Sequence, residues 1–235
     1  MSRNKNQGFT LIEIAIVLVI IGLLLGGILK GQELITSARV RNLISQQDGI
    51  KAAYFGFQDR FRSLPGDYTQ ASTNIVGATA NGNGNGRIEA PAAACAAPCV
   101  AEENILVWEH LSRAGFINGS FTFATAATDN TNPKNPYSVY IDVAFDAAYG
   151  LSTGTSPTRH NIKTGSQVPV EIIGEVDRKV DDGLPYSGAF QFSVYQGNGA
   201  AAPTDVGANA CVNAATPVGW AATSGQTNCG AASLL

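Results

Sequence analysis

The sequence predicts an α+β fold, in which one long N-terminal helix packs on a small antiparallel β-sheet. A predominantly apolar run covers residues 9–29, and helix-tolerant residues continue it without a proline to Arg62. Further along, apolar and small or polar residues partly alternate over residues 138–146 and 189–196, which is typical of half-buried strands. With 235 residues, the chain is long enough to bury an apolar core beside such a helix.

The first half of this helix is predicted to cross a membrane. Within residues 9–29 the only charged residue is Glu13, and about 20 apolar residues suffice to span a hydrocarbon core roughly 30 Å thick. Arg3 and Lys5 precede the run without an acidic residue, so the positive-inside rule keeps the start of the chain in the cytoplasm. The small residue Gly8 lies before the apolar run, whereas a secretory signal peptide has its small residues after it.

The second half of the helix is predicted to be amphipathic. After residue 39, apolar side chains recur at the three- and four-residue spacing of a helix with one buried face. These residues are Val40, Leu43, Ile44, Ile50, Tyr54, Phe57 and Phe61.

A short motif spans the junction between the basic start and the apolar run, where residues 5–13 read Lys-Asn-Gln-Gly-Phe-Thr-Leu-Ile-Glu. It resembles the processing signal of type IV prepilins and type II secretion pseudopilins. The resemblance implies cleavage by a prepilin peptidase after Gly8 and N-methylation of the new terminal residue, Phe9. It also implies that Glu13 pairs with the N-terminal amine of a neighbouring subunit during assembly. A carboxylate inside a bilayer costs several kcal/mol unless it is paired, which agrees with that role.

The same resemblance implies a pilin-like fold in three parts. A leader peptide covers residues 1–8, an N-terminal helix covers 9–62 and a globular pilin head covers 63–235. Within the helix, residues 9–29 are the transmembrane segment and filament core, and residues 30–62 are amphipathic. The implied function is that of a structural subunit of a type IV pilus-like filament. The precursor would lie in the bacterial inner membrane, and the assembled filament at the cell surface.

The implied partners are further copies of the chain in a helical filament, prepilin peptidase, and the pilus assembly platform with its ATPase. Two alternatives stay open: a minor pilin or pseudopilin of a type II secretion or competence system, and a membrane-tethered calcium-dependent adhesin that does not polymerise. A net charge of -3 without a basic stripe indicates no nucleic-acid partner. The sequence has no phosphate-binding loop, nucleophile elbow or zinc-protease motif, so we predict that it is not an enzyme.

The chain has four cysteines, Cys95, Cys99, Cys211 and Cys229. An even number in a chain that leaves the cytoplasm favours disulfides, of which three connectivities are possible. We favour the two local pairs, Cys95 with Cys99 and Cys211 with Cys229. The second pair is similar to the disulfide-bounded loop near the C-terminus of many type IV pilins. A zinc site is the competing interpretation, but the two histidines fall in no ligand-spaced pattern around the cysteines.

A run of alternating asparagines and glycines suggests a first calcium site. Asn81, Asn83 and Asn85 have the odd-position spacing of a calcium loop, although amides replace the usual carboxylates and Ala92 stands where a bidentate Glu belongs. Tertiary contacts could add charge from one of four acids, and the alternative is a solvated loop. The four acids are Asp67, Glu89, Glu102 and Glu103.

Two further helices are predicted, over residues 102–114 and within 169–183. In the second, Ile172, Ile173, Val176 and Val180 are expected to face inward. The C-terminal stretch after Gly197 is expected to be loop-like.

A second candidate calcium site lies at the end of the helix within residues 169–183. Asp177 and Asp181 are one turn apart there, and Asp182 follows. Acidic residues at a helix C-terminus are unfavourable with the helix dipole, which argues for a compensating cation. Arg178 and Lys179 could neutralise the group instead.

Overall fold

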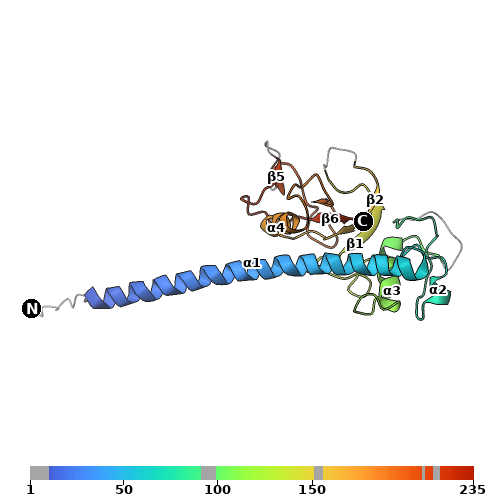
Figure 1. Cartoon of the computed structure of the whole chain (residues 1–235), viewed down its shortest axis with the longest axis horizontal. Coiled ribbons are helices and arrows are strands. Elements are labelled where there is room, and N and C mark those ends of the chain that lie inside the picture. Colours follow the sequence, from blue (N-terminus) through green and yellow to red (C-terminus); the bar gives the residue numbers. More distant parts are fainter. Residues whose placement is uncertain (1–10, 91–98, 151–155, 208–209, 214–217) are drawn as a thin grey trace, which may run out of the picture. The chain divides into compact units, whose positions relative to one another are not determined.

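The computed structural model describes residues 11–90, 99–150, 156–207, 210–213 and 218–235. Helix α1, Leu11–Phe61, is the longest element (Figure 1). The predicted long helix is thus confirmed over its described residues. The chain divides into two compact units, residues 1–39 and 40–235, so α1 contributes to both.

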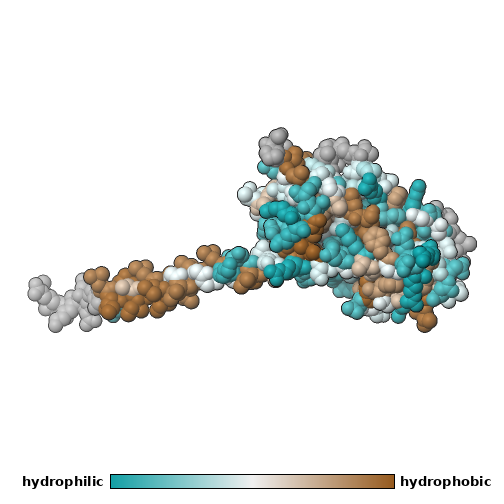
Figure 2. Space-filling model, viewed as in Figure 1, coloured by the Kyte–Doolittle hydropathy of each residue, from teal (hydrophilic) through white to brown (hydrophobic). Residues whose placement is uncertain are grey.

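In the first unit, α1 exposes its apolar side chains. Leu11 is 92% exposed and Leu23 is 74% exposed, and Figure 2 shows that hydrophobic residues cover most of the surface near the start of α1. Among the described residues, α1 is the one helix that is long and apolar enough to cross a membrane, judged by length and composition.

In the second unit, α1 buries one face. Val40, Leu43, Ile50, Tyr54 and Phe57 are all buried, as their spacing predicted. This face meets two apolar clusters. The first includes Ile172, Ile173, Val176, Phe190, Phe192, Cys211 and Cys229, and the second includes Trp108, Leu111, Ile141, Val143 and Ile162.

The main sheet has four strands in the order β1-β2-β6-β3, and every neighbouring pair is antiparallel. The strands are β1, Asp142–Asp146; β2, Arg159–Lys163; β3, Phe190–Phe192; and β6, Ala231–Leu234. A separate antiparallel pair joins β4, Val212–Asn213, to β5, Gly219–Trp220. The structure therefore confirms the α+β arrangement, with β1 and β3 lying inside the two predicted strand segments.

The prediction of a loop-like C-terminal stretch was wrong for β6. This strand consists of Ala, Ala, Ser and Leu, and it pairs with β2 on one side and β3 on the other. Small side chains without β-branching carry little strand preference of their own. Pairing on both edges therefore decides the conformation of this segment.

The described residues of the second unit also form three short helices: α2, Ala71–Asn74; α3, Glu103–Arg113; and α4, Val170–Val180. The helices predicted over residues 102–114 and within 169–183 are confirmed. Gly115, with φ of +81°, follows α3 in the left-handed conformation that ends many helices. Val180 was expected to face inward, but it is 44% exposed because α4 ends there.

Candidate functional site

The predicted processing site lies at the start of α1. Gly8 and Phe9 fall outside the described residues, whereas Glu13 is the acidic residue of the first helical turn. Leu11, Ile12 and Ile14 around it are exposed. Glu13 therefore belongs to an apolar surface, and the positive end of the helix dipole favours its negative charge.

The structure confirms one of the two predicted disulfides. Cys211 and Cys229 are bonded across 18 residues, and both are fully buried. Backbone hydrogen bonds between Cys229 and Val168 fasten this bridge to the segment that leads into α4. Cys99 is also disulfide-bonded, while Cys95, its predicted partner, lies outside the described residues.

The asparagine and glycine loop encloses two carboxylates. Oδ1 of Asp67 accepts hydrogen bonds from the amides of Gly84 and Asn85, at 2.6 and 3.0 Å, and Oδ2 accepts one from Gly86 at 2.8 Å. Glu103 accepts from the amide of Asn83 at 2.9 Å. The two acids therefore reach the loop by tertiary contact, as the sequence suggested, and they bind its N–H groups.

The side chains predicted to bind calcium in this loop accept hydrogen bonds from backbone N–H groups. Oδ1 of Asn81 accepts from the Ser72 amide, and the side-chain oxygens of Asn83 and Asn85 accept from amides two residues further on. Calcium in this loop stays a prediction.

Burial dominates the electrostatics of the enclosed acids. It raises the pKa of Asp67, although the three amide donors act in the opposite direction. It also raises the pKa of Glu103 to about 7, against two further backbone hydrogen bonds. Both carboxylates are therefore held in place by N–H donors while poorly solvated.

A buried ion group that the sequence analysis missed lies on β1 and β2. Lys163 is 3% exposed, and its amine contacts Asp146 and lies 4.0 Å from Asp142. Burial raises the pKa of Asp142, and the charge of Lys163 lowers it. The sequence signal for this group was the spacing of the two acids, since residues four apart lie on the same face of a strand. The position of Lys163 opposite Asp142 depends on strand register.

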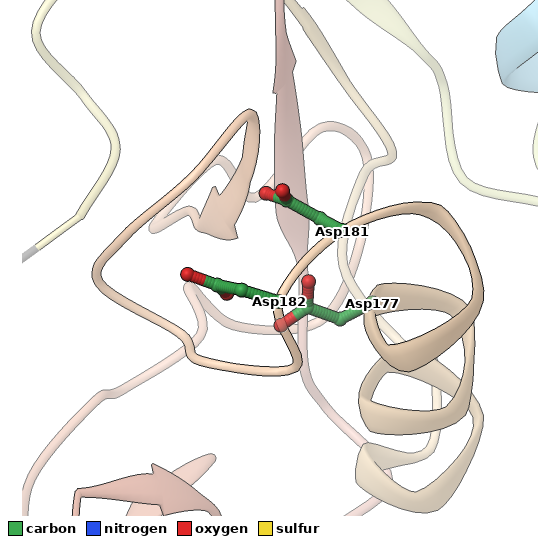
Figure 3. A group of neighbouring side chains, drawn as sticks. All are labelled: Asp177, Asp181 and Asp182. Atoms are coloured by element: carbon green, nitrogen blue, oxygen red, sulfur yellow. The ribbon is translucent and has the colours of Figure 1, made fainter.

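The three acids of the second candidate calcium site lie close together at the end of α4. Asp177 is in the last turn of α4, Asp181 directly follows the helix, and Asp182 comes next. Figure 3 shows the three side chains extending to the same side of the helix end. One carboxylate oxygen from each of the three lies within 4.8 Å of the other two.

Each carboxylate of this group contacts a different segment. Asp177 accepts a 2.6 Å hydrogen bond from the indole N–H of Trp220 on β5. Asp181 accepts from the amides of Ala189 and Phe190, where β3 begins. Asp182 accepts from the Leu184 amide and the Ser187 hydroxyl. No sequence pattern links Trp220 to Asp177.

The comparisons with known proteins identify the N-terminal segment. Residues 3–29 match the family model described as the prokaryotic N-terminal methylation motif. The comparisons with curated proteins and with solved structures found no match.

The matched motif indicates how the chain is processed and where it is located. It implies processing by a prepilin peptidase and assembly through the pilus machinery. With the apolar part of α1, it indicates a membrane-anchored precursor and a pilus or extracellular location. Pilin family proteins, which carry this motif, are structural proteins and not enzymes. The chain therefore combines the prokaryotic N-terminal methylation motif with a long apolar helix and an α+β unit, an arrangement that is similar to that of type IV pilin-like proteins.

Proposed function

We propose that the protein is a structural subunit of an extracellular type IV pilus-like filament, cleaved after Gly8 and assembled through the apolar part of α1. The observation that carries this proposal is the methylation motif over residues 3–29, which continues into a helix with exposed apolar side chains. Exposed apolar surface of this extent is unfavourable in water. Lipid covers it in the precursor, and neighbouring helices cover it in the filament.

Glu13 has a specific role in this proposal. Cleavage after Gly8 leaves a free amine on Phe9, which is positively charged at neutral pH. In an apolar filament core, Glu13 of one subunit pairs with this amine on the next subunit. The contact sets the axial stagger between subunits.

The three-part organisation follows from the same proposal. Residues 1–8 are the leader, residues 9–62 form the helix, and residues 63–235 form the head that faces outward in the filament. The precursor resides in the bacterial inner membrane, and the assembly platform with its ATPase extracts it into a homo-oligomeric filament.

Shearing of surface material tests the proposal. Cells that produce wild-type protein are expected to release filaments whose main component begins with N-methylated Phe9, as measured by mass spectrometry. Glu13→Ala is expected to abolish the sheared fraction while the protein remains in the membrane. Glu33→Ala is the matched control, because Glu33 is on the same helix, 69% exposed, in an ion pair with Lys30. The control is expected to assemble normally.

Other outcomes favour other roles. A chain that begins at Phe9 but forms a trace component of filaments is a minor pilin or pseudopilin. A surface-displayed chain that forms no filament and is unaffected by Glu13→Ala is a tethered adhesin. Either result overturns the proposal of a major structural subunit.

A further inference from the structure

We propose that the carboxylates of Asp177, Asp181 and Asp182 bind one calcium ion at the C-terminal end of α4. The proposal concerns the second unit of the chain and does not depend on filament assembly.

The spacing of the three carboxylates fits a single cation. One oxygen from each lies within 4.8 Å of the other two. Calcium binds oxygen at roughly 2.3–2.6 Å, so two oxygens on opposite sides of one ion are about 4.6–5.2 Å apart. The three oxygens therefore fit within one coordination sphere, and the set consists of the hard oxygen ligands that calcium prefers.

One atom of this group needs a partner. Asp177 is fully buried, and its Oδ1 has no hydrogen-bond partner among the residues that the structure describes. Its other oxygen, Oδ2, already accepts from the indole of Trp220. A buried carboxylate oxygen without a donor is costly. A cation beside Oδ1 removes that cost.

The remaining contacts hold the other two carboxylates in place. Oδ2 of Asp181 is fixed by the amides of Ala189 and Phe190. Gly188 leaves room for this oxygen, because a Cβ atom at residue 188 would lie only 1.9 Å from Oδ2 of Asp181. Asp182 is held by the Leu184 amide at 2.8 Å and the Ser187 hydroxyl at 2.6 Å. The donors thus orient these acids before any ion binds.

Basic side chains do not neutralise the group. Arg178 and Lys179, the two candidates from the sequence, both pair with Glu175, at 3.5 and 3.2 Å. Over the described parts of the chain, no salt bridge joins Asp177, Asp181 or Asp182 to a lysine, arginine or histidine. Three carboxylates are therefore left together without a local positive charge.

The electrostatic environment also favours a cation. The group lies at the negative end of the α4 dipole. Burial, together with the charges of Asp182 and Asp181, raises the pKa of Asp177 to about 6, against hydrogen bonds from Trp220 and from the Gly183 backbone. A divalent ion placed among the three carboxylates offsets the repulsion between them.

Calcium at this position would fasten three segments together. Asp177 reaches β5, Asp181 reaches the start of β3, and Asp182 fixes the loop between α4 and β3. The ion would therefore order the outer part of the second unit in an extracellular, calcium-containing medium. Affinities of about 10⁻⁴–10⁻³ M are typical of extracellular calcium modules.

Terbium luminescence tests the site with the full chain in detergent. Tb³⁺ replaces calcium and emits light when a nearby indole is excited. The indole of Trp220 is close enough for this, because it donates a hydrogen bond to Asp177. Wild-type protein is expected to show terbium emission that calcium displaces, and a melting temperature that rises with calcium but not with equal magnesium. Asp177→Asn and Asp182→Asn are expected to weaken both responses at least tenfold.

Asp59→Asn serves as the matched control, since Asp59 is 82% exposed and lies on α1. It is expected to behave as wild type. If Asp177→Asn fails to fold, Asp182→Asn decides alone, because Asp182 is exposed. The proposal is overturned if calcium up to about 10 mM changes neither signal in wild type, or if both site variants respond as wild type does.

Discussion

The backbone N–H of Gly66 donates a 2.9 Å hydrogen bond to Nδ1 of the buried His110 on α3. On the other side of the ring, Nε2 lies 3.1 Å from the carbonyl oxygen of Ala80. Because Nδ1 accepts, Nε2 carries the proton and the imidazole is neutral. One side chain therefore joins α3 to both ends of the segment between residues 66 and 80.

Acidification is expected to break this arrangement. Burial lowers the pKa of His110 from 6.5 to about 4. The stability that this depressed pKa contributes is present above pH 6.5, and it is lost as the pH falls from 6.5 through 4, because the unfolded chain takes up the proton first. Between pH 7 and pH 5 the loss is about 2 kcal/mol.

Urea unfolding of wild type and His110→Gln at the two pH values measures this loss. The raised pKa values of Asp177 and Glu103 act in the opposite direction, but they are common to both proteins and cancel in the difference. The stability advantage of wild type is expected to shrink by about 2 kcal/mol on acidification. An advantage that is independent of pH would contradict the neutral, buried histidine.

Removal of the Asp67 carboxylate is expected to release the asparagine and glycine loop. Asp67→Ala leaves the amides of Gly84, Asn85 and Gly86 without their acceptor. Buried donors without partners cost about 1–3 kcal/mol each, less where water enters, so we expect a total loss of roughly 2–4 kcal/mol. Hydrogen exchange should become faster at these three amides. Asp59→Ala, at an exposed position, is the control and should leave their exchange unchanged.

Two glycine-to-alanine substitutions are expected to act in opposite directions. A Cβ at Gly82 would lie 2.2 Å from the carbonyl oxygen of Gly66 and 2.3 Å from Cα of Asp67, so backbone would have to move. Gly82→Ala is expected to destabilise by roughly 3 kcal/mol or more. Gly49 is in α1 with open space around it, and Gly49→Ala should stabilise the protein by about 0.5–1 kcal/mol. Thermal unfolding measures the stability change of each variant. Equal changes in the two variants would contradict the close approach of backbone at Gly82.

Loss of the Cys211–Cys229 bond is expected to cost about 3 kcal/mol, because it frees a loop of 18 residues in the unfolded chain. The double variant Cys211→Ala/Cys229→Ala, which leaves the other two cysteines intact, isolates this effect from general reduction. Its denaturant midpoint should fall, and proteolysis should begin within residues 211–229. A midpoint equal to that of wild type would show that the bridge adds no stability.

Local patterns predicted the features that depend on neighbouring residues. The helical spacing of Val40, Leu43, Ile50 and Phe57 predicted the buried face of α1, because a helix repeats every 3.6 residues wherever it packs. The short separation of Cys211 and Cys229 favoured the bond that the structure contains. The same reasoning failed for β6, since its small residues have no strand pattern and its conformation comes from β2 and β3 on either side.

The sequence by itself determined the N-terminal methylation motif and the apolar helix that follows it. The motif over residues 3–29 and the apolar helix are continuous in the chain, so no tertiary contact is needed to recognise them. Only the tertiary structure decided which groups the acids meet. It placed the indole of Trp220 on Asp177 and turned Arg178 toward Glu175, leaving a buried carboxylate oxygen beside two further acids. The physical reason is that Trp220 is 43 residues from Asp177 along the chain, and such a contact depends on how the elements pack.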